Sequence, residues 1–167
     1  MDTSLFHEKQ RFTQWWIWLI LMIPFFTMTY GVYQQLYLGI PFGKQSISDF
    51  SLLSIFFGML CIPASMLIFR LHTRITKEGI HVKFFPFHLK FREYKWEELK
   101  KVQVRKYSPL GEYGGWGLRG FGDNRALNVS GNIGLQLEFH NGKKLLIGTK
   151  KGDEITALLT QLNKLQP

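Results

Sequence analysis

Residues 15–33 read WWIWLILMIPFFTMTYGVY and decide how the chain is organised. They lie within a longer stretch, from Phe12 to Gly43, that contains no Asp, Glu, Lys, Arg or His. A helix needs roughly 20 mainly apolar residues to cross the hydrocarbon core of a bilayer. Tryptophans crowd the start of the stretch and tyrosines its end, where rings with a polar tip favour the headgroup region. The stretch therefore predicts a membrane-spanning helix.

A second uncharged stretch, residues 50–69, reads FSLLSIFFGMLCIPASMLIF and predicts a second span. Small residues recur in it at helical spacing and share one face of the predicted helix. Small side chains let helices approach each other closely in lipid. This face either packs against the first span or forms a seam for a second copy of the chain or a partner membrane protein. Its residues are Ser54, Gly58, Cys61 and Ser65.

The flanking charges predict the orientation of the two spans. Lys9 and Arg11 precede the first span, Arg70 and Arg74 follow the second, and Lys44 is the only Lys or Arg between them. Lys and Arg favour the cytoplasmic ends of membrane helices, so both termini should be cytoplasmic. The predicted parts are a cytoplasmic N-terminal tail (1–12), a first membrane helix (13–38), an outer loop (39–49), a second membrane helix (50–71) and a cytoplasmic domain (72–167).

The cytoplasmic domain has the pattern of a small β domain. Apolar and polar residues alternate along residues 101–107, which is typical of a half-buried strand. Asn141-Gly142, between two alternating runs, is a strong hairpin signal. Residues 155–165 carry an apolar stripe at helical spacing, preceded by Asp153 and Glu154. The sequence predicts an all-β antiparallel barrel or sandwich of about seven strands, followed by a C-terminal α-helix.

Three segments give this domain a resemblance to a known family. They are residues 113–119 (YGGWGLR), 128–137 (NVSGNIGLQL) and 146–149 (LIGT). Together with the two spans and the terminal helix, they are similar to bacterial membrane-anchored PH-like domain proteins. The resemblance implies a PH-like fold and a place in the bacterial inner membrane. It implies no single activity, because PH-like folds serve lipid binding, peptide binding and scaffolding alike.

The composition favours anionic partners. Residues 72–167 hold 17 Lys or Arg and 9 Asp or Glu, and so carry +8 of the formal net charge of +9. A basic domain tethered to a membrane favours anionic lipids, because the cytoplasmic leaflet is negatively charged. No nucleic acid is expected, since the RNA-stacking pattern that opens at Arg119 breaks at Asp123 and Asn124. No catalytic set, metal site or cofactor is predicted, because the single cysteine and five histidines lack ligand spacing.

Candidate binding residues fall into three groups. The first is a run of basic residues on a predicted strand, and the second is a glycine-rich segment with aromatic and arginine side chains. The third is a phenylalanine-rich hairpin tip, whose rings either pack in the core or touch the bilayer beside basic residues. For the second group, Trp116 is either a core residue of a tightly wound loop or part of a partner site. The residues are Lys100, Lys101, Arg105 and Lys106; Tyr113, Trp116 and Arg119; and Phe85 and Phe87.

The sequence thus favours a membrane-anchored binding or scaffolding protein that is not an enzyme. The basic domain would contact anionic lipid or a membrane-complex partner at the inner leaflet. The alternative is an accessory subunit of a transporter or envelope-assembly complex that acts through its membrane helices. The two hypotheses differ in which part of the chain makes the functional contact.

Overall fold

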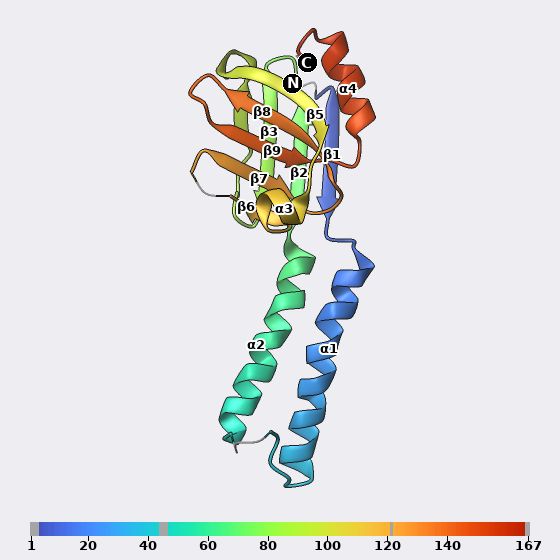
Figure 1. The fold of residues 1–167 in the computed structure, drawn as a ribbon, viewed down its shortest axis with the longest axis vertical. Coiled ribbons are helices and arrows are strands. Elements are labelled where there is room, and N and C mark those ends of the chain that lie inside the picture. The colour runs from blue at the N-terminus through green and yellow to red at the C-terminus, as the bar shows by residue number, and fades with distance from the viewer. Residues whose placement is uncertain (1–3, 44–46, 121, 166–167) are drawn as a thin grey trace. The chain divides into compact units, whose positions relative to one another are not determined.

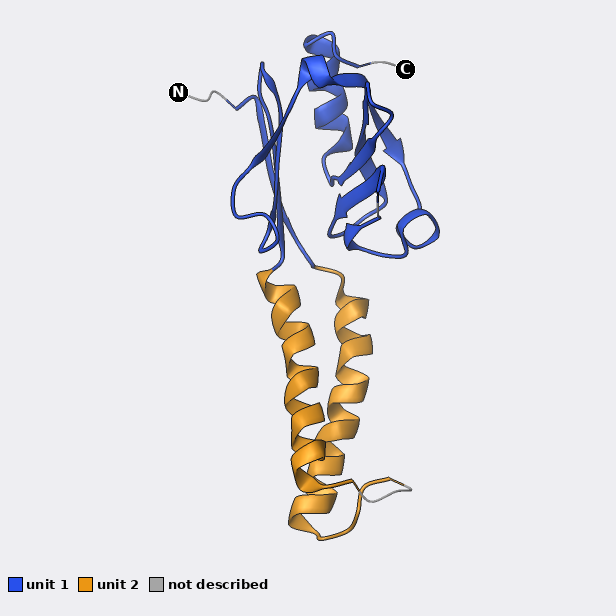
Figure 2. Cartoon of the chain, turned by 90° about the vertical axis from the view of Figure 1, so that its left-hand side faces the viewer, with its two compact units in different colours: residues 1–12, 69–167 blue, residues 13–68 orange. Residues whose placement is uncertain are grey.

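The structure, a computed structural model, describes residues 4–43, 47–120 and 122–165. The chain divides into two compact units. One is Thr13–Ile68, and the other combines Met1–Phe12 with Phe69–Pro167 (Figures 1 and 2). We call them the helical unit and the β unit. Lys44, used above to predict the orientation, lies outside the described residues.

The helical unit contains the two predicted apolar helices. They are α1 (Trp15–Val32), which continues into a π-helical turn (Tyr33–Tyr37), and α2 (Asp49–Ile68). Both are long and apolar enough to cross a membrane. Only 6% of the most apolar window of each is buried, which separates them from the core helix of a soluble protein.

Aromatic side chains and one glutamine hold this helical unit together. Phe25 of α1 stacks on Phe56 of α2, with ring centroids 5.8 Å apart. At the other end of α1, the Gln35 amide donates to the Asp49 carboxylate over 2.6 Å. The predicted small-residue face is not in this contact, because Ser54, Gly58 and Cys61 are exposed. Packing against the first span therefore does not explain why these three positions hold small side chains.

Among its described residues, the β unit has nine strands in two sheets, compared with the roughly seven strands predicted for an antiparallel barrel or sandwich. The sheets pack face to face and do not close into a barrel (Figure 2). Sheet A has the order β1 (Phe6–Arg11), β2 (Arg70–Ile75), β3 (Gly79–Phe85) and β4 (Arg92–Lys95). Sheet B has the order β5 (Leu99–Lys106), β8 (Ile133–Phe139), β9 (Lys144–Gly148), β7 (Asn124–Asn128) and β6 (Gly117–Arg119).

The first strand, β1, was not predicted, because the sequence pattern indicates an N-terminal tail over residues 1–12. It pairs antiparallel with β2, although the whole helical unit lies between the two strands in the sequence. Its inward-facing residues include Glu8 and Gln10, so it lacks the apolar alternation of an ordinary core strand. Glu8 accepts hydrogen bonds from the Thr149 hydroxyl (2.6 Å) and the Lys150 N–H (2.9 Å). Gln10 donates to the Gly148 carbonyl over 2.7 Å. These bonds satisfy the Glu8 carboxylate and the Gln10 amide nitrogen and tie β1 to sheet B, whereas the buried Gln10 Oε1 has no hydrogen-bond partner.

One strand pair is parallel, against the expectation of an antiparallel domain. β7 runs parallel to β9, with Ala126 opposite Leu146 and Leu127 opposite Ile147. The predicted Asn141-Gly142 turn is confirmed between antiparallel β8 and β9, where Gly142 has φ +83°. A positive φ favours glycine because it has no Cβ.

Two helices complete the β unit. The predicted C-terminal helix is confirmed as α4 (Gly152–Gln161), which packs against β5 and β8 and buries Ile155 and Leu159. A short helix that was not predicted, α3 (Pro109–Tyr113), follows β5. Its first turn is capped by Ser108, whose Oγ accepts from the Gly111 N–H over 3.1 Å. A 3₁₀ turn (Trp96–Glu98) joins β4 to β5 and so connects the two sheets.

Candidate functional site: a basic face on sheet A

The outward-facing side of sheet A gathers the basic residues of three strands. Along β1, the side chains of Phe6, Glu8 and Gln10 are buried, and those between them are exposed. β2 and β3 also alternate, but their outward-facing side chains are half-buried. The result is one continuous surface, which we call the basic face. Its residues are His7, Lys9 and Arg11 of β1, Arg70, His72 and Arg74 of β2, and His81 and Lys83 of β3.

The strand register arranges these side chains in rows across the sheet. In the first row, Arg11 lies opposite Arg70, which in turn lies opposite Phe85. In the second row, Lys9, His72 and Lys83 are neighbours. Side chains that are directly opposite have Cβ atoms about 5 Å apart, so like charges in one row repel each other. An anionic partner would relieve that repulsion.

The cations of the basic face lack acidic partners. Within the described part of the chain, none of its five Lys and Arg side chains forms an ion pair with a carboxylate. Instead the Arg74 guanidinium lies 4.5 Å from the ring centroid of Phe91, and the Lys83 ammonium lies 5.9 Å from that of Phe85. Aromatic faces attract cations without cancelling their charge. The positive field of this face is therefore left for another molecule.

The positive charges of the basic face also affect the pKa of His72, which lies in the second row. Burial lowers the pKa of His72 below 6.5, and the neighbouring Lys9, His7, Lys83 and Arg74 lower it further. Like charges disfavour the protonated imidazole because it would add one more positive charge to the cluster. An anion bound at this face would act in the opposite direction and raise the pKa.

An aromatic tip lies at the same end of sheet A as the first row. In the tip, which follows β3, the rings of Phe84 and Phe87 stack with their centroids 5.8 Å apart. Phe69, the residue before β2, stacks on both. Phe84 is fully buried, whereas Phe87 is 59% exposed. Of the two predicted contact residues, Phe85 is half-buried, and Phe87 is the more exposed ring.

The predicted basic strand, β5, has a different character. The Arg105 guanidinium donates to both carboxylate oxygens of Glu112, at 2.7 and 3.2 Å, and also to the Gln136 side chain. Hydrogen bonding from Arg105, and then from the Ser108 N–H, lowers the pKa of Glu112. Arg105 is therefore neutralised within the fold. Lys106 is exposed and, by strand alternation, faces the side of the sheet opposite to Arg105.

The glycine-rich segment uses its aromatic residues for packing and internal hydrogen bonds. Tyr113 is buried in a small cluster with Tyr107, Ala126 and Leu146. The Trp116 indole N–H donates to the Gly131 carbonyl over 3.1 Å. The Arg119 Nε–H donates to the Trp116 carbonyl over 2.9 Å, which folds the arginine back along its own segment. Of these residues, Tyr113 lies close enough to Arg105 of β5 for the two side chains to interact.

Sequence reasoning missed the basic face because its residues come from both sides of the helical unit. The sequence pattern indicates an N-terminal tail for Lys9 and Arg11, and the end of a membrane span for Arg70 and Arg74. The available signal was period-two alternation, with basic residues at positions 7, 9 and 11 and again at 70, 72 and 74. Within the described ranges, no group of three or more His, Cys, Asp or Glu side chains is arranged to hold a metal ion.

The chain matches no protein-family model and no curated protein. The resemblance to membrane-anchored PH-like proteins therefore stays an expectation, carried by residues 113–119, 128–137 and 146–149. We therefore infer the function from the geometry of the β unit.

Proposed function

We propose that this chain is a membrane-anchored, non-enzymatic binding module whose basic face docks on anionic lipid headgroups at the inner surface of a bacterial membrane. The observation that carries the proposal is the set of five Lys and Arg side chains on sheet A that have no carboxylate partner among the described residues. Each basic residue close to an anionic leaflet contributes about 1 kcal/mol of attraction. Five of them would contribute several kcal/mol.

Chain connectivity supports a lipid surface as the partner. Only Phe69 separates the end of α2 from the start of β2, and three residues separate the end of β1 from α1. The first row of the basic face, Arg11 and Arg70, therefore lies within a few residues of both apolar helices in sequence. If these helices cross a bilayer, the nearest extended anionic surface is the leaflet they emerge from. The exposed Phe87 adds the apolar part of an interfacial anchor.

The test uses the full chain in lipid nanodiscs. Cys61→Ser removes the single cysteine, and Leu89→Cys, at an exposed position in the tip after β3, accepts an environment-sensitive fluorophore. Docking predicts a blue-shifted emission on discs that contain anionic lipid. High salt should reverse the shift, because it screens exposed charges. The same emission on neutral and anionic discs would contradict lipid docking.

A second candidate function is binding of a partner membrane protein through α2, as an accessory subunit of a larger complex. The observation that favours it is the exposed small-residue face, where a Cβ added at Gly58 would meet no atom within 4 Å. Gly58→Leu and Ser54→Leu should then reduce the co-purification of a partner from native membranes. If every association survives both substitutions, this candidate is excluded, and the lipid proposal is unaffected.

A further inference from the structure

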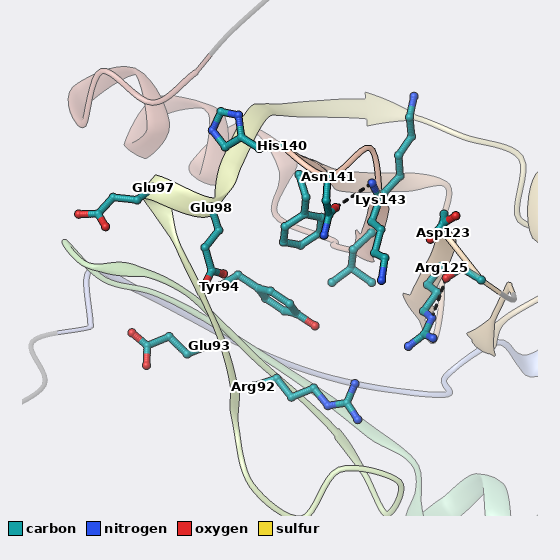
Figure 3. A pocket seen from close by; sticks show the side chains of 14 residues that line it. Arg92, Glu93, Tyr94, Glu97, Glu98, Asp123, Arg125, His140, Asn141 and Lys143 are labelled. Carbon is teal, nitrogen blue, oxygen red and sulfur yellow. Dashed lines mark hydrogen bonds between the residues drawn. The ribbon is translucent and has the colours of Figure 1, made fainter.

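The two sheets part along one side of the β unit and leave a cleft that the basic face does not use. β4, an edge strand of sheet A, forms no ladder with β6, an edge strand of sheet B, or with β7 next to it. The cleft has a cavity volume of ≈690 Å³ and adjoins a second cavity of ≈280 Å³ (Figure 3). Both are lined by Arg92, Tyr94, Gly122, Arg125 and Leu145, and so form one continuous space.

Two arginines enter this cleft at positions where a core residue would normally lie. Arg92 is opposite Val82 in sheet A, and Arg125 is opposite Leu145 in sheet B. Val82 and Leu145 are buried, and paired residues share a face, so both arginines point inward from opposite sheets. Figure 3 shows the two guanidinium groups directed into the same space, beside the Tyr94 hydroxyl. Two cations that face each other in this way are stabilised by an anion between them.

Nothing in the described chain supplies that anion. Neither Arg92 nor Arg125 forms an ion pair with a carboxylate of the described residues. The Arg125 Nε–H donates to the Gly122 carbonyl over 3.2 Å, which orients the guanidinium and leaves its two terminal nitrogens toward the cleft. His88, which lines the inner cavity, is 8% exposed, and its buried Nδ1 has no hydrogen-bond partner. The cleft is thus lined by one buried polar side chain, His88, and by two arginines that are accessible to solvent and to a ligand.

The smaller, inner cavity has an apolar wall, and the larger cavity carries charges of both signs. Leu118, Leu127 and Leu145 line the smaller cavity. The carboxylates that line the larger cavity are Glu93, Glu97, Glu98 and Asp123, and Lys143 and Lys144 line it as well. A ligand with one compact anionic group and a hydrocarbon portion would match both the arginines and the leucines.

We propose that this inter-sheet cleft binds a small anionic amphiphile. Its phosphate or carboxylate would lie between Arg92 and Arg125, and its hydrocarbon portion against Leu118, Leu127 and Leu145. The cavity is large enough, since small-molecule sites commonly occupy about 300–1,000 Å³. Either an acidic lipid of the bilayer or a soluble amphiphile offers this chemistry. The site is separate from the basic face and does not depend on the proposed docking.

The test titrates full-length protein in neutral-lipid nanodiscs with hexyl phosphate, measured by calorimetry against empty discs. Hexyl phosphate should bind at least about tenfold more tightly than inorganic phosphate or 1-hexanol, because each of these lacks one half of the ligand. Arg125→Gln should weaken binding by roughly tenfold or more, as expected for the loss of a charge-assisted hydrogen bond. Leu118→Ser, at a position that is 46% exposed, tests the apolar half at little risk to folding.

Lys106→Gln is the matched control, because it removes an exposed cation of sheet B that lines neither cavity and lies outside the basic face. It should leave hexyl phosphate binding unchanged. The proposal is overturned if Arg125→Gln and Leu118→Ser both bind like the unmodified chain, or if Lys106→Gln alone abolishes binding. Equal binding of hexyl phosphate and inorganic phosphate would also overturn it, since the leucines would then have no role.

The source of the ligand is decided by native mass spectrometry of chain extracted from its own membrane. An adduct with the mass of an acidic lipid, lost in Arg125→Gln, supports the proposal and assigns the bilayer as the source. An adduct with the mass of a single-chain anion, lost in the same variant, supports it and assigns a soluble source. An adduct that persists unchanged in Arg125→Gln counts against the cleft.

Discussion

The outer faces of the two sheets carry similar residues and differ in how their charge is neutralised. On sheet B, Arg105 is paired with Glu112, and Glu138 lies between Lys101 and Lys144 in the strand register. On sheet A, Lys9, Arg74 and Lys83 have no carboxylate partner in the described chain. The first set of charges serves the fold, and the second is left for a partner. Lys100, Lys101 and Lys106 of β5 also form no ion pair among the described residues, so what distinguishes sheet A is that its unpaired cations lie in adjacent rows on paired strands.

The largest expected effect comes from removing charge on sheet A. The triple variant Lys9→Gln, Arg74→Gln and Lys83→Gln should shift the docking equilibrium on anionic nanodiscs by roughly 100-fold, at about 1 kcal/mol per residue. Fluorescence of the label at position 89 measures the docked fraction. The matched variant Lys100→Gln, Lys101→Gln and Lys106→Gln removes the same charge from β5 and should have a much smaller effect. Equal losses in both triples would mean that net charge alone drives docking.

For the free energy of unfolding, the larger effect is expected from sheet B and the smaller one from sheet A. Arg105→Ala removes a two-point hydrogen-bonded pair with Glu112 and leaves the Gln136 oxygen without its donor. It should lower the free energy of unfolding of the β unit by about 1 kcal/mol. Arg74→Ala should change it by less, since it breaks no ion pair. Urea unfolding of both variants, followed by circular dichroism, checks this, and a larger loss for Arg74→Ala would reverse the assignment of roles.

A smaller effect is expected from pH. The pKa of His72 lies below 6.5 in the fold, so the stability linked to its neutral form is present above about pH 6.5 and is lost as the pH falls through the folded pKa. Anionic headgroups would raise this pKa, and docking would then take up a proton. Docking should therefore strengthen as the pH falls below about 6.5. If docking raises the pKa of His72 by one unit, the docking equilibrium should shift by up to about tenfold. His72→Gln should reduce this dependence, and a docked fraction independent of pH would argue against contact at the second row.

The smallest effect is expected on sheet B. Lys144 and Glu138 form an exposed cross-strand pair at 3.2 Å, with the lysine side chain 50% exposed. Lys144→Gln should change the free energy of unfolding by less than about 0.5 kcal/mol, because water and salt screen exposed pairs. It should also leave docking unchanged. A clear loss of docking would extend the lipid-binding surface to sheet B.

Sequence reasoning succeeded where a local pattern carried the information. The uncharged lengths of residues 15–33 and 50–69 were enough for the two helices, Asn141-Gly142 for a hairpin, and Ile155 and Leu159 for the terminal helix. These features depend on neighbours a few residues apart, which one sequence displays directly.

The misses have a different origin. The sequence did not predict β1 because its inward-facing Glu8 and Gln10 find their hydrogen-bond partners at Thr149, Lys150 and Gly148, which are more than 130 residues away in the chain. The parallel β7–β9 pair and the basic face likewise depend on which strands become neighbours. Binary patterning predicts that a strand exists, but it does not identify its partner.

The strand before the helices also constrains how the chain can enter a membrane. Phe6–Arg11 pairs residue by residue with Arg70–Ile75, so both segments must end on the same side of any bilayer. A state in which one helix crosses and the other does not would separate the two strands and break sheet A. If the helices cross a membrane, they therefore cross as a pair, and sheet A can close only after both have been synthesised. Completion of the β unit would then act as a checkpoint on insertion, since a chain inserted through one helix alone could not fold.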